Sequence, residues 1–220
     1  MSREDGNPVN PARRTPSVDS LAADLRHIGF ACRRCGRCCR EGPGDPGLVF
    51  VSREEVETLV ASGAGTWDEI AEPYPDFTPC GSGASVTFGW CVRQAEGRCR
   101  FLAKDGCAAY DARPWICRTY PFALVDGDLG VSDCPGLGGE ISGVEARALA
   151  TVILERARFE REEQERVRAI FPTIRFPAGK RCVVDGSGLQ VCKDRASDPR
   201  AGYTSPRNKA QVAPRSNRRV

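Results

Sequence analysis

The sequence predicts a mainly α-helical fold with a few short β-strands, and an irregular, metal-stapled cysteine-cluster domain. Two observations carry this prediction. Apolar residues recur at helical spacing in three separate segments of the chain. Between the second and third of these segments, cysteines stand among glycine- and proline-rich turns that contain little continuous apolar sequence. A length of 220 residues allows one domain of ordinary size with tails.

The first predicted helix begins at Asp19 or Ser20 and places Leu21, Leu25 and Ile28 on one face. It leads directly into the first group of cysteines. Residues 1–20 before its apolar face are rich in proline, asparagine, serine and arginine, so we expect a disordered N-terminal tail there.

The second predicted helix follows Ser52, where the run Ser-Arg-Glu-Glu forms a capping box with Glu55. The third is a long amphipathic pattern over residues 141–171, which Pro172 ends. We expect its first half to pack on the cysteine domain. Its highly charged second half is expected to project or to pair with another subunit.

Strands are expected at residues 48–51, within 84–90, and in a hairpin over 180–192 whose turn is Asp-Gly-Ser-Gly. The predicted organisation has five parts. These are a disordered tail at 1–20, the cysteine-cluster domain at 21–140, the long helix at 141–171, a hairpin extension at 172–194 and a basic disordered tail at 195–220.

The apolar runs and the charge pattern of the sequence predict where the protein is located and what it could bind. The sequence has no run of 18 apolar residues and no apolar segment near its N-terminus, so we expect a cytoplasmic protein without a membrane span. The net charge of +3 is uneven, with an acidic middle and basic ends. The basic C-terminal tail suits an acidic partner or nucleic acid, or is simply solvated.

The chain contains 12 cysteines and one histidine. A lone His27 excludes zinc sites built from two or three imidazoles. Disulfides rarely persist in a reducing cytosol, so the cysteines are expected to be metal ligands.

Cys32, Cys35, Cys38 and Cys39 form the run C-x2-C-x2-C-C, the most specific signal in the sequence. Its first three cysteines resemble the spacing of iron–sulfur proteins. Adjacent side chains diverge in most backbone conformations, so Cys38 and Cys39 are expected to bind different irons or different centres.

A second group of cysteines comes from three further segments. Its members are Cys99, Cys107, Cys117 and Cys134. The eight cysteines suit two four-cysteine sites, or one cluster with a further metal or reserve thiols. The other four fall outside this pattern: Cys80, Cys91, Cys182 and Cys192. Cys91 is a possible added ligand, and Cys182 and Cys192 a possible separate pair across the hairpin.

These motifs resemble the YkgJ-type cysteine-cluster family, a zinc- or iron-chelating domain. The resemblance rests on F-A-C-x2-C-G-x-C-C from Phe30, C-R-F-L from Cys99, G-C-A-A-Y-D-A-R-P-x2-C-R-T-Y-P-F from Gly106, and C-P-G from Cys134. It implies that these eight cysteines hold metal. Its R-P-x2-C-R motif places Arg113 and Arg118 beside the cofactor. Flagellin lysine N-methylase resembles the same module, which implies a 4Fe-4S cluster and methyl transfer.

The expected function is therefore metal binding, with an iron–sulfur cluster in a redox, structural or methyl-transfer role. Scattered single cysteines favour a cluster, because each iron needs only one protein ligand, whereas zinc sites usually present paired knuckles. The alternative is a zinc-stapled module that binds a protein or nucleic acid. Whether the protein is an enzyme stays open at this stage.

Overall fold

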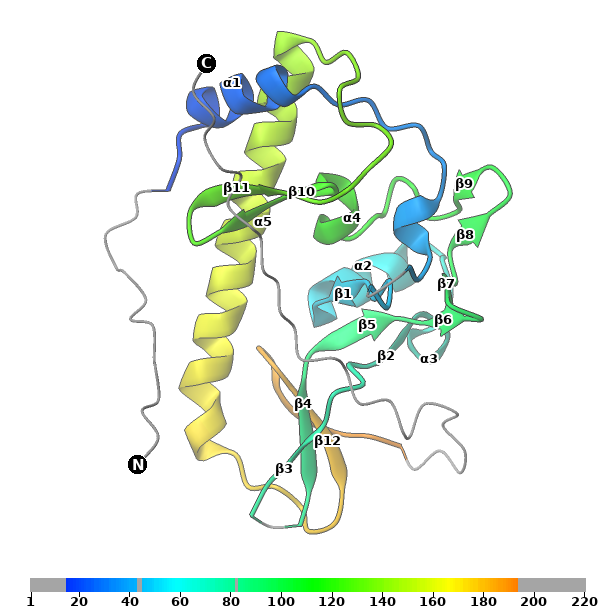
Figure 1. The fold of residues 1–220 in the computed structure, drawn as a ribbon. Helices are drawn as coiled ribbons and strands as arrows, with labels where there is room; N and C mark the ends of the chain where they lie inside the picture. Colours follow the sequence, from blue (N-terminus) through cyan, green and yellow to red (C-terminus); the bar gives the residue numbers. More distant parts are fainter. Residues whose placement is uncertain (1–14, 43–44, 82, 194–220) are drawn as a thin grey trace, which may run out of the picture.

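The computed structural model describes residues 15–42, 45–81 and 83–193 (Figure 1). The predicted C-terminal tail and most of the predicted N-terminal tail lie outside these residues. Of the described residues, 36% are helical and 25% are in strands spread over several small sheets, so the prediction of a mainly helical fold is wrong. Most of the strands are only two to four residues long. Such strands are too short to show the alternating pattern that identifies a strand in a sequence.

Helix α5 (Gly143–Ile170) is the longest element and runs along one side of the molecule (Figure 1). The Ser142 hydroxyl accepts a hydrogen bond from the Glu145 backbone N–H, and the Glu145 carboxylate accepts one from the Ser142 N–H. This capping box satisfies two of the free N–H groups at the helix start.

Helix α1 (Val18–Ile28) packs across the first half of α5, and an ion pair between Asp19 and Arg147 joins the two helices. The helix begins earlier than the sequence predicts because Ser17 is its N-cap. The hydroxyl of Ser17 accepts a hydrogen bond from the backbone N–H of Ser20.

The α1–α5 contact forms one of two hydrophobic cores. Its buried members are Leu21, Ala22, Leu25, Phe122, Ala146, Ala150 and Ile153. Phe122 comes from the hairpin of β10 (Phe122–Val125) and β11 (Asp128–Val131), and its ring meets that of Phe30 edge to face. This core therefore connects the two helices to both ends of the cysteine region.

A four-stranded sheet has the order β13-β12-β4-β3. Strand β12 (Arg181–Asp185) is parallel to β4 (Ser85–Phe88). The outer strands β13 (Gly188–Val191) and β3 (Thr78–Pro79) are antiparallel to their neighbours.

The second hydrophobic core lies under a three-stranded antiparallel sheet of β1 (Phe50–Val51), β5 (Trp90–Val92) and β2 (Ala71–Pro73). Helices α2 (Arg53–Ala61) and α3 (Trp67–Ile70) contribute to it. Its buried side chains include Val56, Leu59, Ile70, Cys99 and Phe101.

The cysteine region is built from short elements. They are the 3-10 helix η1 (Arg37–Cys39), the hairpins β6 (Gln94–Ala95)–β7 (Arg98–Cys99) and β8 (Leu102–Ala103)–β9 (Gly106–Cys107), and helix α4 (Trp115–Thr119). In Figure 1 the two hairpins and η1 lie on the side of the molecule away from α5, whereas α4 lies next to α5, where Trp115 pairs with Phe159.

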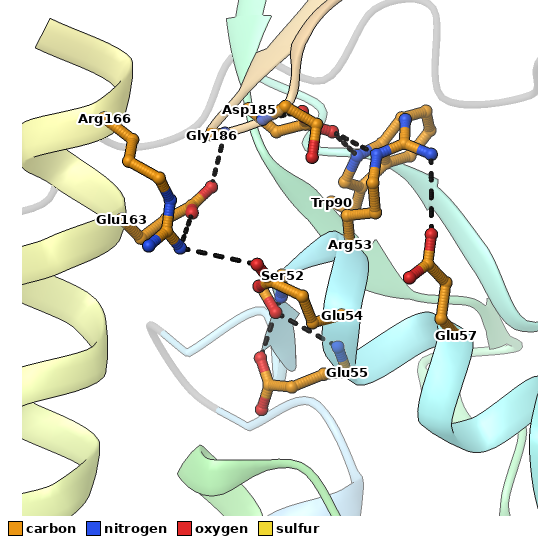
Figure 2. A network of polar contacts seen from close by, with 11 residues as sticks. Ser52, Arg53, Glu54, Glu55, Glu57, Trp90, Glu163, Arg166, Asp185 and Gly186 are labelled. Carbon is orange, nitrogen blue, oxygen red and sulfur yellow. Dashed lines mark hydrogen bonds and ion pairs between the residues drawn. The ribbon is translucent and has the colours of Figure 1, made fainter. Parts of the chain in front are cut away.

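The charged second half of α5 contacts the rest of the chain (Figure 2). Glu163 accepts a hydrogen bond from the Gly186 N–H at 2.6 Å, and Arg166 lies 3.5 Å from Glu54 of α2. The second half of α5 was expected to project or to pair with another subunit. Instead, Glu163 and Arg166 contact other parts of the same chain. A second 3-10 helix, η2 (Phe171–Thr173), follows it directly. No helix among the described residues is both long enough and apolar enough to span a membrane.

Candidate metal centre

The loop of residues 31–40 carries four of the predicted ligands and is fixed at both ends by cysteine-bearing segments. At its start, Phe30 pairs with Leu137, and the Ala31 N–H donates to the Gly136 carbonyl at 3.0 Å. At its end, Arg40 pairs with Arg98, and the Glu41 N–H donates to the carbonyl of the neighbouring Gly97 at 2.8 Å. The first anchor brings the Cys134 segment to the start of the loop, and the second brings the Cys99 segment to its end. Burial raises the pKa of Cys99, and the thiols whose charges raise it further are Cys107 and Cys38.

The middle of this loop turns at Gly36, whose φ of 68° is left-handed. A Cβ at this position would lie 2.7 Å from a methyl carbon of Leu102, so the backbone passes directly over β8. Arg37 forms an ion pair of 2.8 Å with Asp133, the residue before Cys134. The loop thus lies between the β8–β9 hairpin and the segment that contains Cys134.

Four cysteines form what we call the inner set: Cys39, Cys99, Cys107 and Cys117. Cys99 is part of the buried core under the β1-β5-β2 sheet, and the other three pack against that core. The antiparallel pair Arg40–Arg98 places the next residues along, Cys39 and Cys99, opposite each other. The inner set therefore joins the cysteine loop, two hairpins and helix α4 to the hydrophobic core.

The remaining four predicted ligands form the outer set: Cys32, Cys35, Cys38 and Cys134. The first three are exposed, and Cys134 is half-buried. The Gly136 N–H donates to the Cys134 sulfur at 3.4 Å. The two sets meet at the adjacent cysteines, where Cys38 Sγ lies 3.9 Å from Cys39 Sγ.

Burial and neighbouring thiols raise the pKa of several of these cysteines. Burial, followed by the charges of Cys99, Cys38 and Cys107, raises the pKa of Cys117 to about 12. The pKa of Cys134 is raised by burial and then by Cys35, Cys38 and Cys32. Thiols that influence one another in this way are gathered in space. Because only thiolates bind metal, binding here requires the loss of protons.

The two predicted arginines lie beside this site. The Arg113 guanidinium stacks 3.6 Å from the centre of the Tyr110 ring. The hydrogen bond with Cys39 raises the pKa of Cys38 and burial raises the pKa of Cys117, and the positive charge of Arg113 only partly offsets these two shifts. Arg34 lies over the same ring at 4.3 Å. Arg118 stacks over Trp115 at 4.5 Å. Direct contact of Arg113 and Arg118 with a cofactor stays a prediction.

The donor set suits a thiolate-bound metal, because eight cysteines from five segments lie in this region: the loop, the two hairpins, α4 and the Cys134 segment. Within the described ranges, however, no three cysteine, histidine, aspartate or glutamate side chains are arranged as ligands of one metal ion. The backbone contacts bring the cysteine-bearing segments together. The assignment of the eight cysteines as ligands stays a prediction.

The four other cysteines lie outside the two sets, although Cys192 packs against the same core as the inner set. Cys182 pairs with Val191 across the hairpin, whereas the Cys192 N–H donates to the Arg181 carbonyl. Because neighbouring residues of a strand point to opposite faces, the side chains of Cys182 and Cys192 do not face each other, and the expected pair across the hairpin does not form. Cys91 is buried, and its thiol donates to the Glu72 carbonyl at 3.7 Å.

Sequence reasoning missed two residues at this site. Glu55 was predicted to cap only its own helix, yet its carboxylate also accepts a hydrogen bond of 2.7 Å from the Trp115 N–H at the start of α4, which carries Cys117. The Tyr120 hydroxyl donates to the Asp133 carbonyl at 2.6 Å. Its place in the R-T-Y-P-F run was a usable signal, but no local pattern connects Glu55 with Trp115.

Eight cysteines gathered in one region of the fold define a cysteine-rich domain. Residues 31–136 match the model of the CxxCxxCC family, described as "Putative zinc- or iron-chelating domain", so the protein carries a domain of this family and binds metal. The matched residues include all eight cysteines of the inner and outer sets. No curated protein and no solved structure matches the chain.

Proposed function

We propose that the protein is an iron–sulfur protein that holds its metal through the inner and outer sets. The observation that carries the proposal is the composition of the outer set. Three of its cysteines have the spacing C-x2-C-x2-C, and the fourth, Cys134, comes from a remote segment tied to the same loop. This is the pattern that binds a 4Fe-4S cluster in ferredoxins.

The charges around the loop support a cluster over a zinc ion. Arg33, Arg34 and Arg37 are exposed beside the outer set, and Arg113 lies nearby. A cluster held by four thiolates is anionic, and positive side chains near it stabilise the charge and raise the reduction potential. When bound, such a cluster supplies one-electron transfer, so we propose a redox or structural role.

The chain's own residues position the ligands. Gly36 permits the turn between Cys35 and Cys38, the Arg37–Asp133 ion pair holds the Cys134 segment against the loop, and Glu55 fixes the start of the helix that carries Cys117. A reducing cytoplasm, which we propose as the location, would keep the cysteine thiols available to bind metal.

The second candidate is a zinc protein, and the family description favours it because it names zinc as well as iron. Four thiolates suit tetrahedral zinc as well as they suit iron–sulfur clusters. In that case the metal would be a staple for a module that binds another molecule.

Anaerobic purification of the full chain, followed by analysis of iron, acid-labile sulfide and zinc, separates the two candidates. We expect a brown protein with equal amounts of iron and sulfide. Cys80→Ser, outside both sets, should keep the same content, whereas Cys35→Ser should lower it. Colourless protein with stoichiometric zinc would overturn the iron–sulfur proposal and establish the second candidate.

Methyl transfer rests on the family resemblance alone. Titration of the metal-loaded protein with S-adenosylmethionine in a calorimeter tests it, and the absence of binding heat would remove this role.

A further inference from the structure

We infer that Tyr120 is a positioning residue for the metal ligands: its hydroxyl group fixes Asp133 at a junction where three cysteine-bearing segments meet. These segments are the loop of residues 31–40, helix α4 with Cys117, and the segment that contains Cys134. The inference rests on the proposed metal binding, and it adds which side chain other than the thiols holds the ligands in place. It applies to one metal centre as well as to several.

The β10–β11 hairpin explains why Tyr120 and Asp133 meet. Tyr120 is the C-cap of α4, and the hairpin that follows it returns the chain to Asp133. The Ser132 N–H donates to the Pro121 carbonyl at 2.8 Å, which extends the pairing of β10 and β11 beyond the two strands. Residues 120 and 133 therefore lie at the base of the hairpin, close together in space although 13 positions apart in the sequence.

Two contacts from different segments converge on Asp133. The Tyr120 hydroxyl donates to the Asp133 backbone carbonyl at 2.6 Å. The Asp133 carboxylate forms an ion pair of 2.8 Å with Arg37, the residue before Cys38 in the loop. The end of α4 and the loop are thus both held against the residue that precedes Cys134. One residue therefore links three segments that each carry predicted ligands.

Thiols of these segments lie around the Tyr120 hydroxyl. Burial raises the pKa of Tyr120 to about 12, and the next causes of this shift are the charges of Cys134 and Cys38. The charge of Cys38 also adds to the raised pKa of Cys117 and of Cys134, after burial in both cases. The junction is therefore part of the region in which the predicted ligands gather, and the protonated hydroxyl is available there as a hydrogen-bond donor.

The two contacts to Asp133 are expected to differ in strength. The side chains of Arg37 and Asp133 are 62% and 80% exposed, and ion pairs between exposed side chains are weak and screened by salt. Tyr120 is half-buried and donates to the backbone, so loss of its hydroxyl leaves the Asp133 carbonyl without this donor. Tyr120 should therefore contribute more than Arg37 to the placement of the ligands.

The test is the half-time of metal loss to excess EDTA, measured on the full-length protein purified with its native metal. Tyr120→Phe removes only the hydroxyl and should shorten the half-time about fivefold, as expected for one lost hydrogen bond. Arg37→Ala should shorten it about twofold at low salt and leave it unchanged at high salt. Tyr74→Phe is the matched control and should have no effect, because the Tyr74 ring packs on Phe50 at the β1-β5-β2 sheet.

Alkylation by iodoacetamide, read by mass spectrometry, separates positioning from a general loss of stability. In the metal-loaded Tyr120→Phe variant, Cys117 and Cys134 should react faster than in wild type. Cys91 and Cys182, which are fully buried and outside both sets, should stay protected. An unchanged half-time, or equally faster reaction of Cys91 and Cys182, would overturn the role of Tyr120. Wild-type protein purified without metal would refute the proposed function on which this role depends.

Discussion

At the residue scale, Asp185 shows how a buried charge is accommodated away from the cysteines. Its side chain is 1% exposed and accepts hydrogen bonds from the Trp90 indole at 2.8 Å and from the Ser187 N–H at 2.9 Å. Arg53 lies 3.4 Å away and provides the opposite charge (Figure 2). The carboxylate therefore connects the hairpin of β12 and β13 to α2 and β5.

Replacing Asp185 with alanine should lower the free energy of unfolding by about 3 kcal/mol, because it leaves the half-buried Arg53 guanidinium and the Trp90 indole N–H without their acceptor. Urea denaturation measures the change. Glu57→Ala is a matched control, since Glu57 pairs with the same arginine at 3.9 Å but is exposed. Its removal should cost less than about 0.5 kcal/mol. Equal losses in the two variants would contradict this interpretation.

Glu55 makes the stability dependent on pH. Burial raises its pKa above the ordinary value of 4.5, so the folded state binds the proton more tightly than the unfolded state. The stability that this group contributes is complete below pH 4.5 and is lost as the pH rises through the raised pKa. Glu55→Gln cannot ionise, so it should gain stability relative to wild type as the pH rises above 4.5. Urea denaturation at a series of pH values measures this difference.

Glu69 provides a control of opposite sign. Hydrogen bonds from Thr66 lower the pKa of Glu69, so its contribution is present above pH 4.5 and is lost as the pH falls. Glu69→Gln should therefore lose stability relative to wild type as the pH rises towards 4.5. If the stability difference from wild type changed with pH in the same direction for Glu55→Gln and Glu69→Gln, the opposite pKa shifts of the two carboxyl groups would be contradicted.

At the scale of elements, the cysteine loop depends on Gly36. Alanine there would adopt a left-handed φ and would also clash with Leu102 of β8. Gly63 has a similar φ of 79° but has open space around it. The two positions therefore separate backbone strain from steric conflict.

We expect Gly36→Ala to bind less metal than wild type, while Gly63→Ala should pay only the backbone cost of about 1–2 kcal/mol and keep its metal. Metal analysis and thermal unfolding of both variants decide the point. Full metal content in Gly36→Ala would show that the close approach to β8 does not matter for ligand placement.

Helix ends and hairpin turns that depend on neighbouring residues can be predicted from the sequence. The capping box at Ser52 and the hairpin at Asp185–Gly188 are found in the structure. The β10–β11 hairpin turns at Asp126-Gly127, and Asp-Gly is a recognised hairpin signal. By contrast, the parallel pairing of β12 with β4 joins segments almost a hundred residues apart, and no local pattern predicts it.

The same distinction applies to the candidate site. The side chains of the adjacent Cys38 and Cys39 were expected to diverge, but their sulfurs lie only 3.9 Å apart, and whether the two cysteines bind different centres stays a prediction. Which remote cysteine accompanies each of them depends on the Phe30–Leu137 and Arg40–Arg98 pairs. Such long-range contacts depend on tertiary packing, which sequence spacing does not encode.

At the scale of the whole molecule, the two hydrophobic cores differ in their dependence on metal. The buried residues of the core between α1 and α5 are all aliphatic except for Phe122 of the β10–β11 hairpin, and none is a cysteine. The other core includes Cys99, and three further inner cysteines pack against it. Thiolate–metal bonds contribute on the order of 10 kcal/mol to folding, comparable to the net stability of a domain.

Removal of the metal should therefore loosen the cysteine region and leave the α1–α5 contact protected. Hydrogen exchange measured by mass spectrometry before and after chelation tests this expectation. We predict faster exchange in residues 31–42 and 94–119 and little change in α1 and in the first half of α5. Uniformly unchanged exchange would show that the fold does not need the metal.

The central claim is that sulfur atoms of the inner and outer sets bind the metal. X-ray absorption at the metal edge of the purified full-length protein measures this most directly. We predict a first coordination shell made only of sulfur, at about 2.3 Å if the metal is zinc. A first shell dominated by oxygen or nitrogen would contradict the claim.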